Sequence, residues 1–412
     1  MCSPKACRES YGKEFRTEPV SAESYNEAAC PFKAAVEKLQ QLRAQGEDIL
    51  PLKVPPHYQR LIEDEVNELG DFGGPLYNVA YPKPERWTTF VPNEVKNFVA
   101  DNEHMPAGLE DVIIHRYTGK ILYLTTSTCL GHCQYCFRPD IAGAANQDEG
   151  AGDNLSPHIL DRICAYLEEH PRIREVILSG GDPLTCEISR LEYAVQRLTA
   201  VPSVKSCRLH TRAPAYAPQG LTDRFIRLLE HCNIHLVIHA VHPYELDAEA
   251  ATPLLAMRRR GIMMYNQFPL IRGINDHPGV IMELGYRCTE LGVHMLSMFI
   301  ADPIKFCAAY RVRLQRVFDI ADEIFFHGEA WLSNMRVCQD TPIGKVKREH
   351  ILPYAAGPDQ HIFRRQGRSV TYQDIPRELD NPTPLSRLLY AGTAYADLSL
   401  WPERYYGHER SA

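Results

Sequence analysis

Three cysteines stand close together in the chain, with a spacing that suits a metal centre. Cys129, Cys133 and Cys136 form a C-x3-C-x2-C pattern. Three thiolates at this spacing can bind three irons of a cubane iron–sulfur cluster and leave the fourth iron open for a small molecule. The other interpretation is a zinc site that takes a fourth ligand from elsewhere, such as His132. Zinc sites usually contain a second C-x2-C pair. No such pair follows in this sequence, and we therefore favour the iron–sulfur cluster.

A glycine-rich turn follows the next buried strand of the sequence. Residues 176–178 read Val-Ile-Leu, and residues 179–183 read Ser-Gly-Gly-Asp-Pro. Gly180 and Gly181 lack a β-carbon, so the backbone can approach a ligand closely at this point. The plainer interpretation is an ordinary turn between a strand and a helix. The glycine-rich turn comes one strand–helix unit after the cysteines, and this position favours a binding site that the turn and the cysteines form together.

Short apolar strands alternate with amphipathic helices over the middle of the chain. Six segments predict strands: the apolar runs at residues 121–124 and 176–178, and residues 204–209, 234–238, 263–268 and 294–299. The segments between them carry apolar residues at helical spacing. Such alternation implies parallel strands with right-handed crossovers. We therefore predict an α/β fold, a partial (β/α)6-type barrel with fewer units than a complete barrel has.

The predicted barrel occupies residues 111–330, between two regions of different texture. Residues 1–110 are polar and rich in proline, which predicts an N-terminal region of helices and loops. Residues 331–412 are expected to form an irregular C-terminal extension, with only loops and a tyrosine-rich tail after about residue 350.

The composition is that of an ordinary globular protein. Of 412 residues, 44% are hydrophobic and 24% are charged, which excludes a wholly disordered chain. The formal net charge of -7 argues against a protein that grips nucleic acid, and no apolar run is long enough to span a membrane. The chain has thirteen cysteines, and its N-terminus shows no apolar stretch of the kind found in a secretion signal. Together these features predict a cytoplasmic protein whose thiols are free or bound to metal.

The cysteine motif resembles that of the radical S-adenosylmethionine (SAM) superfamily, in which it follows the first barrel strand. Tyr135 matches the aromatic residue that commonly precedes the last cysteine. The resemblance implies a [4Fe-4S] cluster on Cys129, Cys133 and Cys136, whose open iron binds SAM. One-electron reduction by a donor such as flavodoxin or ferredoxin then yields a 5′-deoxyadenosyl radical.

The resemblance also assigns the turn after the second strand to the cofactor site. In the superfamily such a turn contacts the methionine amino group of SAM, which implies cofactor-binding roles for Gly180, Gly181 and Asp182.

Longer stretches are similar to the lysine 2,3-aminomutase branch of the superfamily. They run from about residue 50 to about residue 355 and include His-Arg-Tyr at 115–117, Thr-Arg-Ala-Pro at 211–214 and Asn-Gln at 266–267. The branch implies a second cofactor, pyridoxal 5′-phosphate (PLP), which needs a lysine for its Schiff base. It also implies a small-molecule amino acid substrate.

Two lysines compete for PLP in the segment after Asp340. Lys345 follows a glycine and opens a Lys-x-x-Arg-Glu sequence, whereas Lys347 lies at the better ungapped distance from Asp340. We favour Lys345; both could instead be surface charges. Arg116 and Lys120 align with positions that hold the PLP phosphate, which suits cationic side chains.

The branch implies three further residues for the substrate. Arg138 aligns with the arginine that pairs with the substrate carboxylate, and Asp302 and Asp340 align with two carboxylates that hold a distal ammonium. The presence of both aspartates favours a basic amino acid as the substrate, lysine first and arginine second. Glutamate or an uncharged amino acid remains an alternative substrate. The expected reaction moves the α-amino group to the β-carbon.

Two rival functions remain open at this point. One is a radical SAM enzyme that uses no PLP and acts on another small molecule or a peptide. The other is a non-catalytic zinc-binding interaction protein. No cysteine follows Cys338, so the tail zinc site of some branch members has no ligands here, and a homo-oligomer would have to form without it.

Overall fold

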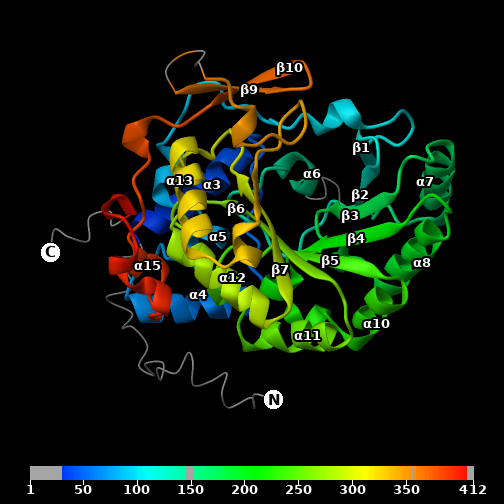
Figure 1. Ribbon diagram of the computed structural model, residues 1–412, viewed down its shortest axis with the longest axis horizontal. Helices are drawn as coiled ribbons and strands as arrows, with labels where there is room; N and C mark the ends of the chain where they lie inside the picture. The colour runs from blue at the N-terminus through cyan, green and yellow to red at the C-terminus, as the bar shows by residue number, and fades with distance from the viewer. Residues whose placement is uncertain (1–29, 144–152, 354–356, 358, 406–412) are drawn as a thin grey trace.

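An eight-stranded sheet in the order β1-β2-β3-β4-β5-β6-β7-β8 forms the centre of the computed structural model, which describes residues 30–143, 153–353, 357 and 359–405 (Figure 1). β1 is antiparallel to β2, and every later pair of neighbours is parallel. The strands are β1 (Ile113–Tyr117), β2 (Lys120–Thr126), β3 (Glu175–Gly180), β4 (Ser206–Thr211), β5 (Ile234–Ile238), β6 (Met264–Leu270), β7 (Val293–Ile300) and β8 (Arg336–Cys338).

A helix follows each of the strands β2 to β7 and packs on the outer side of the sheet (Figure 1). These helices are α7 (Pro157–Glu169), α8 (Ile188–Thr199), α10 (Asp223–His231), α11 (Ala248–Arg259), α12 (Pro278–Glu290) and α13 (Leu314–His327). A side-chain cap marks the start of α7, where the Oγ atom of Ser156 accepts a hydrogen bond from the backbone N–H of Ile159 at 3.4 Å.

The sheet is open, with β1 and β8 as its two edges. Six parallel strands with their helices confirm the partial (β/α)6 barrel, and β8 adds a seventh parallel strand. The helix-facing residues of the strands are fully buried, for example Val176, Leu209 and Leu236. Among the described residues, no helix is both long and apolar enough to cross a lipid bilayer.

Helices and turns of the N-terminal region pack against the barrel. They include α3 (Cys30–Ala44), α4 (Pro56–Leu69) and α5 (Pro75–Ala80). Glu65 of α4 accepts hydrogen bonds from the backbone N–H groups of Leu76 and Tyr77 at 2.8 and 2.7 Å, and so satisfies donors at the start of α5.

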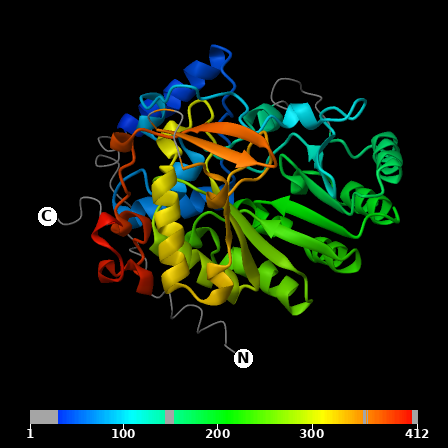
Figure 2. The ribbon, with the colours of Figure 1, turned by 45° about the horizontal axis from the view of Figure 1, so that its top comes forward.

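The expectation that only loops follow residue 350 is wrong. β9 (Gln360–Arg365) and β10 (Arg368–Gln373) form an antiparallel hairpin. Its two-residue loop has positive φ at both Gln366 (49°) and Gly367 (77°), the geometry of a type I′ turn. The hairpin packs on the segment after β7, where the Tyr372 hydroxyl donates to the carbonyl oxygen of Ala301 at 3.5 Å (Figure 2).

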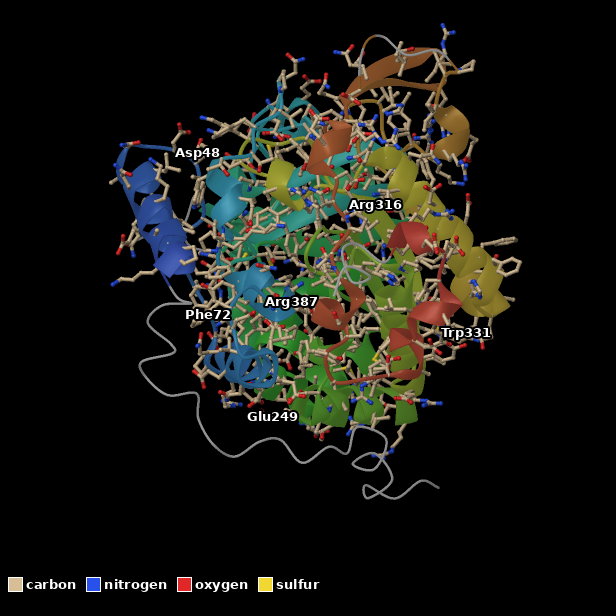
Figure 3. The ribbon with its side chains drawn as sticks, turned by 90° about the vertical axis from the view of Figure 1, so that its left-hand side faces the viewer. Asp48, Phe72, Glu249, Arg316, Trp331 and Arg387 are labelled. Atoms are coloured by element: carbon tan, nitrogen blue, oxygen red, sulfur yellow. The ribbon has the colours of Figure 1, made fainter. Side chains whose placement is uncertain are left out.

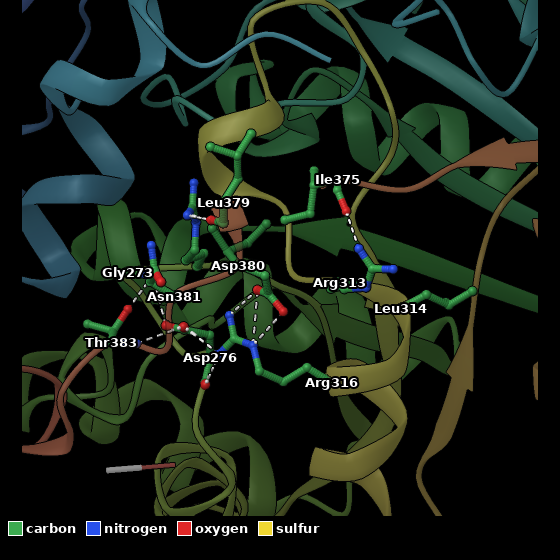
Figure 4. A network of polar contacts seen from close by, with 12 residues as sticks. Gly273, Asp276, Arg313, Leu314, Arg316, Ile375, Leu379, Asp380, Asn381 and Thr383 are labelled. Atoms are coloured by element: carbon green, nitrogen blue, oxygen red, sulfur yellow. Dashed lines mark hydrogen bonds and ion pairs between the residues drawn. The ribbon is translucent and has the colours of Figure 1, made fainter. Parts of the chain in front are cut away.

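Buried ion pairs fasten the C-terminal segment to the barrel (Figure 4). The guanidinium of Arg316 on α13 donates to the carboxylate of Asp276 at 2.9 Å and to that of Asp380 at 2.6 Å. On the face shown in Figure 3, Arg387 donates to both carboxylate oxygens of Asp71 at 2.7 Å. These contacts join residues far apart in the sequence into one folded unit.

Candidate active site

The three cysteines of the motif lie in the loop that leaves β2. This loop is bonded to the N-terminal region: the backbone N–H of His132 donates to the carbonyl oxygen of Lys53 at 2.9 Å, and the Lys53 ammonium donates to that of Cys129 at 2.6 Å. Nδ1 of His132 lies 2.8 Å from the carbonyl oxygen of Pro51. The conformation of the cysteine loop therefore depends on residues that lie about 80 positions earlier in the sequence.

The thiols of Cys129, Cys133 and Cys136 are free and partly buried. Burial is the largest cause that raises the pKa of the Cys129 thiol, and it raises that of Cys136 to about 12. Bare thiolates are therefore unfavourable here, and a cationic metal centre would supply the missing compensation. This donor chemistry fits an iron–sulfur cluster.

The arrangement of the thiols does not match a single zinc ion. Four ligands around zinc lie about 4 Å or less from one another, since each is bound at about 2.3 Å or closer. Within the part of the chain that the structure describes, only His57, Asp247 and Glu249 bring three possible ligand atoms within 4.8 Å of one another. The three thiols, with or without His132, form no such group.

The glycine-rich turn after β3 packs directly on the segment that leads into the cysteine loop. A β-carbon on Gly180, whose φ is 112°, would lie 2.3 Å from the carbonyl oxygen of Thr126. One on Gly181 would lie 2.1 Å from that of Thr128. The backbone N–H groups of Gly181 and Asp182 donate to the same two oxygens at 2.7 and 2.8 Å. Both glycines are therefore required by backbone packing at the base of the cysteine loop.

Asp182 joins the end of β3 to the end of β4. Its buried carboxylate accepts hydrogen bonds from the Thr211 hydroxyl and from the backbone N–H of Arg212, each at 2.9 Å. It also accepts from the backbone N–H of Leu184 at 3.0 Å. The Asp182 side chain thus ties the turn after β3 to the end of β4.

A cavity of about 500 Å³ lies on the inner face of the sheet. It is lined from the strand starts, at Lys120 and Glu175, to the segments beyond the strand ends, at Asp302. Six of the residues singled out in the sequence line it: Arg116, Lys120, Arg138, Asp302, Asp340 and Lys345. The others are not among its lining residues: Cys129, Cys133, Cys136, Gly180, Gly181, Asp182 and Lys347.

The two candidate lysines have different environments. The Nζ atom of Lys345 lies 2.7 Å from both carboxylate oxygens of Asp340 and 4.3 Å from the centre of the Phe299 ring. Its backbone N–H donates to the Tyr117 hydroxyl at 3.1 Å, which fixes the loop against β1. Lys347 is half exposed and lies 3.3 Å from Glu349. Of the two lysines, only Lys345 lines the cavity.

Two carboxylates near the Lys345 nitrogen differ in their affinity for protons. Burial, with the nearby charge of Asp340, raises the pKa of Asp302 to about 8, despite a short hydrogen bond from Gln339. Burial would also raise the pKa of Asp340, but the charge and hydrogen bonds of Lys345 outweigh it, and the pKa of Asp340 is lowered. Asp302 therefore binds a proton more readily than Asp340 does.

Cationic side chains line the wall at the strand starts. Lys120, Arg208 and Arg336 line the cavity there, with Glu175 paired to Arg208 at 2.8 Å. Burial, and then the charge of Arg208, lowers the pKa of Lys120. A phosphate would relieve this repulsion, so this wall could hold the phosphate of a cofactor.

Arg116 and Arg138 already have protein partners. Arg116 donates to the carbonyl oxygen of Thr341 at 3.1 Å, and Arg138 donates to Asp101 at 2.8 Å. Asp101 also lies 3.5 Å from Arg116, so one carboxylate joins the two guanidinium groups. A ligand carboxylate at Arg138 would have to share the guanidinium with Asp101.

A polar triangle on the inner wall was absent from the site residues chosen from the sequence. The Nε2 atom of Gln267 lies 3.2 Å from Nδ1 of His210 and 3.1 Å from Nε2 of His239. Burial, followed by the charge of Arg212, lowers the pKa of His239 to about 3. Alternation along β4 and β6 could have revealed His210 and Gln267, because each lies two residues from another cavity-lining residue, Arg208 and Tyr265.

Comparison with known proteins adds independent findings. Residues 123–276 match the family model described as "Radical SAM superfamily". The chain is 30% identical over 342 residues to a "Putative L-lysine 2,3-aminomutase" of Aquifex aeolicus, covering 82% of this chain and 85% of that protein. It is 26% identical to the "L-lysine 2,3-aminomutase" of Methanococcus maripaludis, covering 79% of this chain and 72% of that protein. The corresponding Clostridium subterminale enzyme is 27% identical, with 64% and 62% covered.

Proposed function

The chain belongs to the lysine 2,3-aminomutase branch of the radical SAM superfamily, and from this premise we propose that it moves the α-amino group of a basic L-amino acid to the β-carbon. An enzyme of this branch is an isomerase that needs a small-molecule substrate and a one-electron reductant. The observation that carries the proposal is the cavity position of Lys345, beside Asp340 and Asp302.

In this proposal the cysteine loop holds a [4Fe-4S] cluster. Cys129, Cys133 and Cys136 would each bind one iron, and SAM would occupy the fourth, next to the turn of Gly180 and Gly181. The close packing of that turn on the cysteine loop supports a shared site. Bound together and reduced, cluster and SAM supply a radical that abstracts hydrogen from the substrate.

Lys345 is the proposed anchor of PLP, with Lys120 and Arg116 on the side of its phosphate. PLP supplies the conjugated group that carries the nitrogen during its migration. Lys345 holds its nitrogen in the cavity through Asp340, and Phe299 lies beneath it. The buried wall around them limits the access of water to a reactive radical.

The same carboxylate that now holds Lys345 can serve the substrate. The Asp340 carboxylate, which pairs with the Lys345 ammonium here, would pair with the distal cation of a basic amino acid when the Lys345 nitrogen is withdrawn from it. Asp302 gives the second carboxylate, and Arg138 is proposed to bind the α-carboxylate of the substrate. This arrangement supports lysine first and arginine second as the substrate.

Anaerobic incubation of the reconstituted protein with SAM, PLP, dithionite and a panel of amino acids tests the proposal. The panel holds lysine, arginine, glutamate and alanine, and mass spectrometry scores β-amino acids. We expect β-lysine or β-arginine, no product from alanine, and none from Cys133→Ala with any substrate. Cleavage of SAM without consumption of any amino acid would favour a radical SAM reaction without PLP. Bound zinc in place of iron would overturn the enzyme assignment.

A further inference from the structure

A tyrosine hydroxyl touches one of the three motif sulfurs. Tyr216 ends the short helix α9 (Ala213–Tyr216), which follows β4. Its hydroxyl oxygen lies 3.0 Å from the Sγ atom of Cys133, and the side chain is 2% exposed. Among the described residues, a backbone hydrogen bond from Arg138 also reaches a motif sulfur, that of Cys136, whereas Tyr216 reaches Cys133 with its side chain.

The Tyr216 ring is fixed by packing from two sides. A β-carbon on Gly131, inside the cysteine motif, would lie 3.0 Å from Cε2 of Tyr216 and 2.7 Å from Cδ of Pro55. The ring of Tyr58 meets that of Tyr216 edge-on, with centroids 4.9 Å apart. The loop therefore closes on the tyrosine ring, and the hydroxyl has little freedom to turn away from the sulfur.

A buried ion pair lies behind the ring. The guanidinium of Arg212 stands 4.5 Å from the centre of the Tyr216 ring and donates to Glu245 at 2.5 Å and to the Tyr135 hydroxyl at 2.9 Å. Because the Glu245 carboxylate offsets the Arg212 charge, the pair adds little net field at the cluster. The hydroxyl in direct contact with Cys133 is the stronger influence on its sulfur.

We propose that Tyr216 is a positioning residue that raises the reduction potential of the cluster through a hydrogen bond to Cys133. The inference rests on the cluster assignment of the proposed function. An iron-bound thiolate has no proton, so the hydroxyl must be the donor. A donor to sulfur favours the reduced cluster, which carries one more negative charge, and it thereby eases electron transfer from a low-potential donor.

The Tyr216→Phe variant tests this role, because it removes the hydroxyl and keeps the ring. Redox titration of the reconstituted holoenzyme, followed by electron paramagnetic resonance, gives the midpoint potential of the cluster. We expect the ratio of reduced to oxidised cluster at a fixed potential to fall about tenfold, from the typical strength of a hydrogen bond to a charged group. That factor corresponds to a midpoint about 59 mV lower for one electron.

Tyr58→Phe is the matched control. Its hydroxyl belongs to the same buried network but donates to Glu245 at 2.7 Å rather than to a sulfur. We expect its midpoint to stay at the wild-type value. An equal shift in both variants, or none in Tyr216→Phe, would overturn the proposed role.

A measurement on the wild-type protein covers the case in which Tyr216→Phe assembles no cluster. Electron–nuclear double resonance of the reduced cluster in D2O should detect two exchangeable deuterons close to cluster sulfurs, one from the Arg138 backbone and one from the Tyr216 hydroxyl, and the absence of the second overturns the inference. If the wild-type protein itself binds no iron and sulfide, the proposed function fails instead, so the two failures are distinguishable.

Discussion

Lys345 and Asp340 form an ion pair inside the cavity, with Nζ 2.7 Å from each carboxylate oxygen. The pairing of Gln339 with Val346, in which each backbone N–H donates to the other residue at 2.9 Å, sets these two side chains opposite each other. The register of this isolated antiparallel bridge, rather than the lysine itself, therefore decides which lysine lines the cavity.

Substitution of the two lysines should separate their roles. Lys345→Ala is expected to abolish the visible absorption band of lysine-bound PLP and to stop turnover. Lys347→Ala should keep both, because Lys347 is half exposed and paired with Glu349. Absorption spectra after PLP loading and desalting measure the difference. A lost band in Lys347→Ala and an intact one in Lys345→Ala would reverse the assignment.

Binding of a cationic substrate should expel a proton from Asp302. The pKa of Asp302 is raised to about 8, so at pH 7 it is mostly protonated, whereas a nearby ammonium favours its ionised form. Affinity for lysine should therefore rise as the pH approaches 8 and then level off.

Calorimetry in two buffers of different ionisation enthalpy measures this proton. With PLP-loaded protein at pH 7, we expect L-lysine to release more protons than L-norleucine, which lacks the ammonium. In Asp302→Asn the difference should vanish. Equal proton release by both ligands in the wild-type protein would contradict the role of Asp302.

Gly181→Ala should disturb the cysteine loop. The added β-carbon would lie 2.1 Å from the Thr128 carbonyl oxygen, a backbone atom that can move only with the loop. We expect destabilisation of about 1–3 kcal/mol and less than half the wild-type iron content after reconstitution. Gly220→Ala is the control, since nothing lies within 4 Å of its β-carbon position. Equal iron content in the two variants would mean that the loop tolerates the shift.

Arg316→Met should loosen the C-terminal segment. It leaves the buried carboxylates of Asp276 and Asp380 without their cation, which costs about 3–5 kcal/mol. Urea denaturation of the cofactor-free protein should show this loss. Arg224→Met, which removes a pair with Glu192 at the surface, should change stability by about 1 kcal/mol or less. Similar losses in both variants would argue against a special role for the buried pair.

The repeating part of the fold could be predicted from the sequence because predicted strands alternate there with segments that carry apolar residues at helical spacing. The apolar residues 176–178 lie within β3, and the predicted strand at residues 234–238 coincides with β5. The edges could not be predicted in this way. β8 has three residues, too few to show a period, and β1 carries His115 and Arg116 in its middle.

The hairpin after residue 350 was missed for a related reason. Its loop is Gln366-Gly367, whereas the usual signal for a type I′ turn is asparagine or aspartate before glycine. Gln366 and Gly367 adopt this turn because the two flanking strands are stabilised by packing, in which Phe363 and Tyr372 are fully buried.

Site residues that belong to a local sequence motif could be predicted from the sequence. Site residues that only the fold brings together could not. The sequence brought forward Lys345 and Asp340, yet spacing alone could not choose between the lysines, because the loop lengths that set the pairing are properties of the fold. His210 and Gln267 lie on different strands, and only the sheet brings them to 3.2 Å.

The bonds between the cysteine loop and residues 51–53 bear on the order of events during synthesis. Pro51 and Lys53 leave the ribosome before Cys129, so the partners of the loop are present when it emerges. Lys345 emerges about 200 residues later, and the cavity is complete only with β8 and the segment after it. The two proposed cofactor sites would thus be completed at different times, the cysteine loop first and the cavity wall that carries Lys345 last.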